Sequence, residues 1–115
     1  MNEKGCETFV SDCHVRAAAE LINHTWDPVV LSALRMGPTR RNVLLDRIAG
    51  ASDKVLAESL RRLASRRLIT RATRDSRRDA AVYELTALGA SFASGPLAHL
   101  AEWAAENQLE LSATS

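Results

Sequence analysis

Two cysteines and three histidines are the side chains of this chain best suited to redox chemistry or metal binding. Cys6 and Cys13 lie near the N-terminus, His14 follows the second cysteine, and His24 and His99 lie farther along the chain. This spacing matches no standard zinc motif. We therefore expect no metal site. We expect both thiols to be reduced at rest, because the sequence carries no export signal.

Cys13 is the candidate for chemical sensing. A sulfur at the start of a predicted helix feels the positive end of the helix dipole, and His14 and Arg16 add cationic neighbours if they face it. These effects favour the thiolate, which is the form that reacts with electrophiles and oxidants. Cys6 could resolve a sulfenic acid on Cys13. The alternatives are that Cys13 is a half-buried packing residue and that Cys6 is an unused thiol.

Catalytic motifs are absent from the sequence. It contains no Walker-type phosphate loop, no H-E-x-x-H and no G-x-S-x-G, and its histidines have no carboxylate pattern typical of a triad. We therefore expect no enzymatic activity and no cofactor.

The basic residues are concentrated in the middle of the chain. From Arg35 to Arg78 there are thirteen basic and four acidic residues, a net charge of +9, whereas the ends carry two basic and ten acidic residues, a net charge of −8. This layout is typical of a surface that binds a polyanion. The alternative is a solvated charged face. Aromatic residues make up only 4% of the chain, too few for the stacked rings of single-stranded nucleic-acid binders.

Hydrophobic periodicity predicts four helices in the first part of the chain. They are expected at 13–23, from Pro28 to Gly37-Pro38, at 41–49 and over about 53–67. Asp27 is predicted to cap the second helix and Ser52 the fourth. The fourth helix has an apolar face of Leu56, Leu60 and Leu63. Its opposite face carries Lys54, Glu58, Arg61 and Ser65.

The periodicity then becomes alternating. Segments 68–73 and 80–85 are predicted strands, joined by the polar connection RDSRRD into a hairpin with an arginine-rich tip. Thr86 opens a last helical region at about 87–107, which Gly95-Pro96 is expected to interrupt. We expect one domain over residues 11–108, flanked by flexible tails at 1–10 and 109–115.

This order of elements predicts a mainly α fold with a small β-hairpin, the winged helix-turn-helix. Several motifs, in order and spacing, resemble the HxlR family of bacterial winged-helix regulators, a MarR-like family. They are Cys13, Trp26, LSALRMGPTR at 31–40, S-x-K-V-L at 52–56, Leu60-Arg61-x-Leu63, Leu68-Ile69-Thr70-Arg71, Tyr83-x-Leu85-Thr86-x-x-Gly89 and Trp103. The chain departs from the family pattern at His14, Arg41, Ser59 and Arg67, where that pattern has proline, an aromatic residue, arginine and glycine, and it lacks the prolines ahead of the wing tyrosine.

The fourth helix is the expected recognition helix, whose N-terminal turns approach base edges in the major groove. Arginine or lysine pairs there with guanine, and valine contacts a thymine methyl group. The residues expected to read DNA are Ser52, Lys54, Val55, Ser59 and Arg62. The residues expected to bind phosphates are Arg40, Arg74, Arg77 and Arg78. The alternatives are helix capping for Ser52 and ordinary solvation for the others.

The family resemblance implies a homodimer in which the first and last helices pack across a two-fold axis. The expected interface residues are Val15, Ala18, Ile22, Leu97, Leu100 and Trp103. The resemblance also implies that Cys13 can act as a redox sensor. Arg71 is expected at a strand of the wing, where it could brace the hairpin.

The sequence thus predicts a homodimeric, sequence-specific transcriptional regulator, a repressor, controlled by thiol modification or by a small effector. Its expected partners are a double-stranded DNA operator and a second copy of itself. A cytoplasmic location is expected, because no apolar run approaches the about 20 residues that span a bilayer. The alternative function is a protein-interaction adaptor, a winged helix that offers its basic face to an acidic protein.

Overall fold

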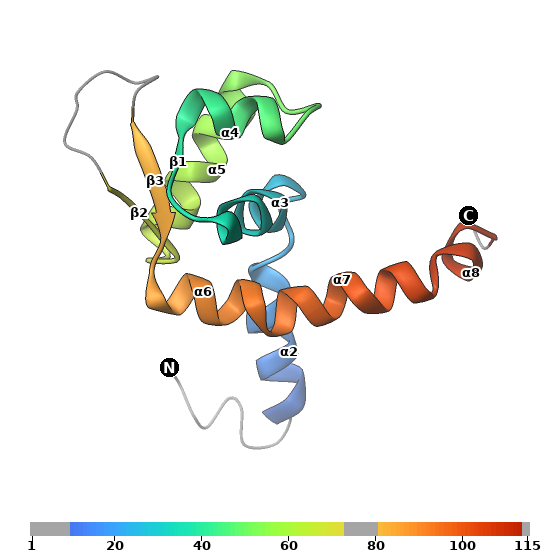
Figure 1. The fold of residues 1–115 in the computed structure, drawn as a ribbon. Helices are drawn as coiled ribbons and strands as arrows, with labels where there is room; N and C mark the ends of the chain where they lie inside the picture. Colours follow the sequence, from blue (N-terminus) through green and yellow to red (C-terminus); the bar gives the residue numbers. More distant parts are fainter. Residues whose placement is uncertain (1–9, 73–80, 114–115) are drawn as a thin grey trace.

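The computed structural model describes residues 10–72 and 81–113 (Figure 1). Helices dominate, and one small antiparallel sheet lies beside them. In chain order the elements are α2 (Val10–Glu20), α3 (Trp26–Ala33), the 3-10 helix η1 (Leu34–Met36), β1 (Thr39–Arg40), α4 (Arg41–Arg47), α5 (Asp53–Ser65), β2 (Ile69–Arg71), β3 (Val82–Leu85), α6 (Ala87–Ser94), α7 (Pro96–Glu106) and α8 (Gln108–Ala113). The prediction of a mainly α fold is confirmed.

Helix α3 lies at the centre of the molecule and contacts α5, α4, α6 and α7 (Figure 1). Val30 and Leu31 on α3 are completely buried. They pack in a core with the apolar faces of α5 and α7, represented by Leu56 and Leu97. Because α3 is apolar around most of its circumference, it suits this central position.

The start of α3 differs from the sequence prediction. Asp27 was expected to be the N-cap, but Thr25 occupies that position, without a side-chain capping bond, and the helix begins at Trp26. Asp27 lies in the first turn and is fully buried. The prediction failed because the Asp27 carboxylate bonds side chains of α5 and not the amides of its own helix.

Helices α4 and α5 follow the prediction closely. Gly50, with a φ of 107°, turns the chain between them. The Ser52 hydroxyl accepts a hydrogen bond of 3.1 Å from the amide of Val55, which is the predicted N-cap of α5. Leu56 and Leu63 on the predicted apolar face are completely buried.

The predicted hairpin is present as β2 and β3, which pair antiparallel with Ile69 opposite Leu85 and Arg71 opposite Tyr83. The sheet also contains β1, a strand that the sequence analysis did not predict, in the order β1-β3-β2. Its two residues are too few to show an alternating pattern. Three helices, α3 to α5, followed by this hairpin form the winged helix-turn-helix arrangement.

The C-terminal helices carry the chain away from the sheet (Figure 1). Thr86 caps α6 by accepting a hydrogen bond of 3.0 Å from the amide of Gly89, and Gly95 separates α6 from α7, both as predicted. A tail was expected after residue 108, but residues Gln108–Ala113 form α8. The segments expected as the N-terminal tail and the hairpin tip lie largely outside the described residues. No helix within the described ranges is long and apolar enough to cross a membrane.

Candidate nucleic-acid interface

The N-terminus of α5 is held by an ion pair from α4. The Arg41 guanidinium donates to the Asp53 carboxylate at 2.6 Å and to the Asp53 carbonyl oxygen at 3.2 Å. Arg41 is only 3% exposed, whereas the Asp53 side chain is 53% exposed. The pair therefore fixes the start of α5 and neutralises an acidic side chain there. This role of Arg41 was not predicted from the sequence, because its partner Asp53 is twelve positions away.

A second polar cluster holds the middle of α5 against α3. The Ser59 hydroxyl donates to the Asp27 carboxylate at 2.6 Å, and the Arg62 guanidinium donates to the two Asp27 oxygens at 2.8 and 3.0 Å. Burial raises the pKa of Asp27, but the hydrogen bonds from Arg62 and Ser59 and the charge of Arg62 outweigh it, so that the pKa is lowered. The hydrogen bond to Asp27 in turn raises the pKa of Arg62. The Asp27 carboxylate is therefore ionised and fully satisfied.

This cluster corrects two predicted DNA contacts. Ser59 is completely buried, so its hydroxyl cannot reach a base edge in this conformation. The Arg62 side chain is 30% exposed, but its guanidinium is committed to Asp27 by two donors. Both residues were assigned from helix angle alone, and the contacting residue on α3 is more than thirty positions away in the sequence.

The outward face of α5 retains other candidates. Ser52 and Lys54 are exposed and Val55 is half-buried. Farther along the same face Glu58 is half-buried and Arg61 is exposed. Ser52 caps α5, which is the structural role given above as the alternative to DNA contact. Its hydroxyl accepts one hydrogen bond there and can still donate another.

Phosphate contacts were predicted at four arginines. Arg40 is exposed at the end of β1, directly before α4. Arg74, Arg77 and Arg78 lie outside the described residues. Arg71 ends β2 and is exposed.

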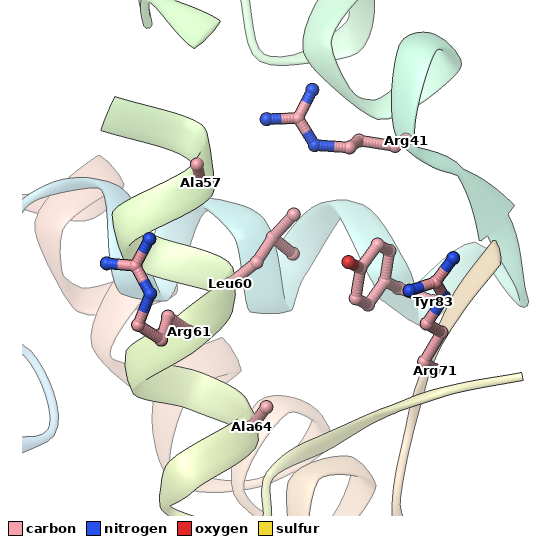
Figure 2. Close-up of a pocket in the computed structure, with 7 residues that line it drawn as sticks. All are labelled: Arg41, Ala57, Leu60, Arg61, Ala64, Arg71 and Tyr83. Atoms are coloured by element: carbon pink, nitrogen blue, oxygen red, sulfur yellow. The ribbon is translucent and has the colours of Figure 1, made fainter. Parts of the chain in front are cut away.

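A hollow of about 540 Å³ lies between α5 and the base of the wing (Figure 2). Its lining residues are Arg41, Ala57, Leu60, Arg61, Ala64, Arg71 and Tyr83. Figure 2 shows Arg71 and Tyr83 on the strands facing α5 across the hollow, with the Tyr83 hydroxyl directed toward the helix. This hollow was not predicted from the sequence. The available signal was the pair of alanines seven residues apart on α5, which leave room beside the helix.

Within the described ranges no group of three or more histidine, cysteine, aspartate or glutamate side chains could hold a metal ion. Helix α5 is capped at Ser52, braced by Arg41 and Asp27, carries Lys54 and Arg61 on its outward face and lies beside a β-wing.

The family model for HxlR-like helix-turn-helix proteins matches residues 21–112. The chain belongs to this family.

Relatives of this HxlR-like protein include transcriptional regulators. The HTH-type transcriptional regulator YtfH of Escherichia coli (strain K12) is 32% identical over 105 residues, which are 91% of this chain and 82% of YtfH. A structure of YtfH from Salmonella typhimurium has 29% identity and a TM-score of 0.73, over 87% of this chain and 88% of that one. The quinone-bound YodB of B. subtilis has 24% identity and a TM-score of 0.67, over 81% of this chain and 96% of YodB.

The family match establishes an HxlR-like transcriptional regulator with a winged helix-turn-helix fold. The HxlR-like family comprises regulators and not enzymes. The family match therefore agrees with the absence of catalytic motifs from the sequence. It leaves the assembly, the controlling signal and the individual contact residues to be inferred from the structure.

The predicted dimer residues of the HxlR-like protein divide into two groups. Val15 is 63% exposed, Leu100 45% and Trp103 55%, and Ile22 and Ala18 are also exposed. Leu97, in contrast, is only 6% exposed and packs in the core of the protomer. The sequence did not separate Leu97 from Leu100 and Trp103, because a helix face covered by its own chain and a face covered by a second subunit are both apolar.

Cys13 lies in the first half of α2 and is disulfide-bonded in this structure. The expectation of a free, reduced thiol at rest therefore differs from what the structure contains. Cys6, the other cysteine of the chain, lies outside the described residues.

The carbonyl oxygen of Glu20, the last residue of α2, accepts a hydrogen bond of 2.7 Å from Arg66 at the end of α5.

Proposed function

We propose that this HxlR-like protein is a homodimeric repressor that binds a pseudo-palindromic DNA site through α5. The observation that carries the proposal is the basic, outward face of α5, which is braced from behind and flanked by a β-wing. Lys54, which is exposed, and Val55, which is half-buried, lie in its first turns and would meet base edges. Ser52 contributes through its remaining hydroxyl donor, and Arg40 and the tip arginines Arg74, Arg77 and Arg78 bind phosphates.

Two exposed apolar surfaces support the dimer. Every side chain from His14 to Glu20 on α2 is exposed, including Val15 and Ala18. On α7, Leu100 and Trp103 are exposed. Large apolar side chains on two helices outside the core are typical of a surface that a second subunit covers. A two-fold dimer would present two recognition helices to half-sites about one helical turn apart.

Repression would follow if the DNA site of such a dimer overlaps a promoter. A protein bound across a promoter excludes RNA polymerase without a separate activating surface. Control would act through the dimer helices, either by chemical modification of Cys13 after its disulfide is reduced or by a small effector. YodB, which shares this fold, has been captured with quinone bound. Displacement of α2 would reach α5 through the bond between Arg66 and Glu20.

The test is a fluorescence-anisotropy titration with DNA from upstream of the protein's own gene, against scrambled DNA of equal length at fixed salt. A specific regulator is expected to bind the upstream DNA at least about a thousandfold more tightly. The titration is repeated on protein that has first been reduced, before and after addition of diamide, for wild-type and Cys13→Ser protein. Release of wild-type protein but not of the variant supports control at the thiol, and equal release of both refutes it.

Equal, weak binding to both DNAs would contradict the proposal. It would instead favour the adaptor, which uses a basic winged helix to hold an acidic protein and binds DNA without regard to sequence.

A further inference from the structure

Two hydrogen-bond donors that line the hollow between α5 and the wing have no acceptor among the described residues. The first is the Nε–H of Arg41. The other two nitrogens of this guanidinium donate to Asp53, and the side chain makes no further hydrogen bond in the described part of the chain. The second is the Tyr83 hydroxyl, which has no hydrogen bond to any described residue either. Both residues line the hollow.

The Arg41 donor is the more informative of the two, because polar groups on buried side chains are nearly always bonded. Arg41 is only 3% exposed. Within the described ranges, no buried side-chain nitrogen or oxygen atom lacks a partner, so the Arg41 Nε must be reachable by solvent. In Figure 2 the terminal nitrogens of Arg41 point away from Leu60 and Tyr83, whereas Nε lies on the side of the hollow. The Tyr83 hydroxyl is directed toward Leu60, so both donors face the same space (Figure 2).

The wall of the hollow on α5 is apolar between its charged ends. Leu60 lies between Ala57 and Ala64, whose side chains end at Cβ and leave the space open. The volume of about 540 Å³ falls within the range of small-molecule sites in proteins. Two donors opposite an apolar wall suit a ligand with a flat apolar body and one group that accepts hydrogen bonds.

The charges around the hollow favour an acidic acceptor group. Its lining contains three arginines and no acidic residue. Arg71 has an interaction of its own, and Figure 2 draws the Arg61 guanidinium turned away from the wing, so neither is counted as a donor to the ligand. The positive charge of Arg61 nevertheless attracts an anion without direct contact. A guanidinium N–H also bonds a carboxylate more strongly than it bonds a neutral oxygen.

We propose that the hollow binds a small organic monocarboxylate with a flat apolar body. Its carboxylate accepts hydrogen bonds from the Arg41 Nε–H and the Tyr83 hydroxyl, and its apolar body packs on Leu60 between the two alanines. Binding of this ligand does not depend on DNA, but its effect on DNA rests on the proposed function.

A ligand in the hollow would act on α5 directly. It lies beside the helix and contacts Arg41, the residue that holds the start of α5 through Asp53. Its carboxylate adds a negative charge between α5 and the wing, next to the surface that is proposed to meet phosphates. The bound carboxylate should therefore weaken DNA binding.

The test is a calorimetric titration of sodium 2-naphthoate into the full-length protein without DNA. One saturable site for each protomer is expected. 2-Naphthamide has the same rings and a neutral acceptor, and it should bind at least about tenfold more weakly. Acetate has the carboxylate without the rings and should show no saturation over the same concentration range. Equal binding of 2-naphthoate and 2-naphthamide would overturn the assignment of a carboxylate site.

Two variants remove the donors one at a time. Tyr83→Phe keeps the ring and removes the hydroxyl. Arg41→Lys keeps a charge for Asp53 and removes the Nε–H. Each is expected to weaken 2-naphthoate binding by about tenfold. Asp53→Asn is the control for Arg41→Lys, because it weakens the same ion pair at a residue that does not line the hollow, and it should retain binding.

A third variant closes the space without touching either donor. Ala64→Leu places a larger side chain at the edge of the hollow and is expected to abolish 2-naphthoate binding. Ala87→Leu, at an exposed alanine of α6 that does not line the hollow, is its matched control and should bind as wild type does. Thermal unfolding is recorded for every variant, so that loss of binding is not confused with loss of fold.

The effect on DNA is measured by repeating the titration with upstream DNA in saturating 2-naphthoate. Wild-type affinity is expected to fall by about tenfold, a typical size for coupling between two sites. No saturable 2-naphthoate binding, equal binding by folded Ala64→Leu protein, or an unchanged DNA affinity would overturn the proposal while specific DNA binding remains. Saturable 2-naphthoate binding by a wild-type protein that binds no DNA specifically would contradict the proposed function and leave the carboxylate site supported.

Discussion

The Asp27 carboxylate is the polar centre of the contact between α3 and α5. An aspartate before a proline predicted a solvated N-cap, yet its carboxylate is buried and binds Ser59 and Arg62. Local sequence patterns describe neighbours within a turn or two, and these partners lie on another helix. The same limit explains why Ser59 and Arg62 were predicted to face DNA, whereas Ser52, whose capping partner is three residues away, was predicted correctly.

Replacement of Asp27 by asparagine is expected to destabilise the fold. Asparagine keeps the shape but loses the charge that pairs with Arg62, and we expect the free energy of unfolding to fall by about 2 kcal/mol. Chemical denaturation measures this change. The exposed Asp46→Asn variant is the control, with an expected change within about 0.5 kcal/mol. An Asp27→Asn effect no larger than that of the control would show that the ion pair adds no net stability.

The contribution of Asp27 should depend on pH in a defined direction. Its pKa is lower in the folded protein than its ordinary value of 3.8. The ion pair therefore stabilises the fold fully above that ordinary value, and its contribution disappears as the pH falls through the folded pKa. The difference in unfolding free energy between wild type and Asp27→Asn should be constant between about pH 7 and pH 5 and should shrink below about pH 4. A difference that grew on acidification would contradict this assignment.

At the scale of elements, helices were predicted well because their apolar periodicity and caps are local. The capped starts of α5 and α6 and the break at Gly95 all appear in the structure. Strand β1 was missed because it is defined by pairing with β3, with Thr39 opposite Tyr83, and has no pattern of its own. Helix α8 was predicted as a tail, since its six residues lack a strong apolar period.

Close packing of α6 against Leu68, the residue directly before β2, depends on one glycine. A Cβ added at Gly89 would lie 1.9 Å from the carbonyl oxygen of Leu68, a backbone atom that cannot rotate away. Gly89→Ala should therefore force α6 away from β2 and lower the free energy of unfolding by about 3 kcal/mol. Thermal unfolding tests this expectation, with the exposed Ser91→Ala of the same helix as control. Equal stability of the two variants would mean that α6 shifts without cost.

At the scale of the whole molecule, the surfaces of α2 and α7 define what the protomer leaves uncovered. Leu97 and Trp103 lie on the same helix, but Leu97 packs in the core and Trp103 is exposed. Sequence placed both at the dimer interface, because it could not distinguish a helix face covered by the same chain from one covered by another. The distinction requires the position of α7 relative to α3.

These two residues should therefore respond differently to truncation. Leu97→Ala should lower the free energy of unfolding by about 2 to 4 kcal/mol, as expected for a buried leucine. Trp103→Ser should leave the protomer folded but shift it from dimer to monomer and weaken operator binding. Light scattering after size exclusion, together with thermal unfolding, separates the effects. A Trp103→Ser protein with an unchanged mass at low micromolar concentration would exclude this face as the interface.

Helix α5 is fastened at its start by Arg41, in its middle by Asp27 and at its end through Arg66 to Glu20. None of these three attachments uses the outward side chains Lys54 and Arg61. The orientation of the helix and the chemistry of its exposed face are therefore encoded by separate residues. If α5 binds DNA as proposed, outward positions such as Lys54 and Arg61 could be exchanged one at a time, in a laboratory or over evolution, to redirect the protein to new DNA sites without rebuilding the scaffold that holds the helix.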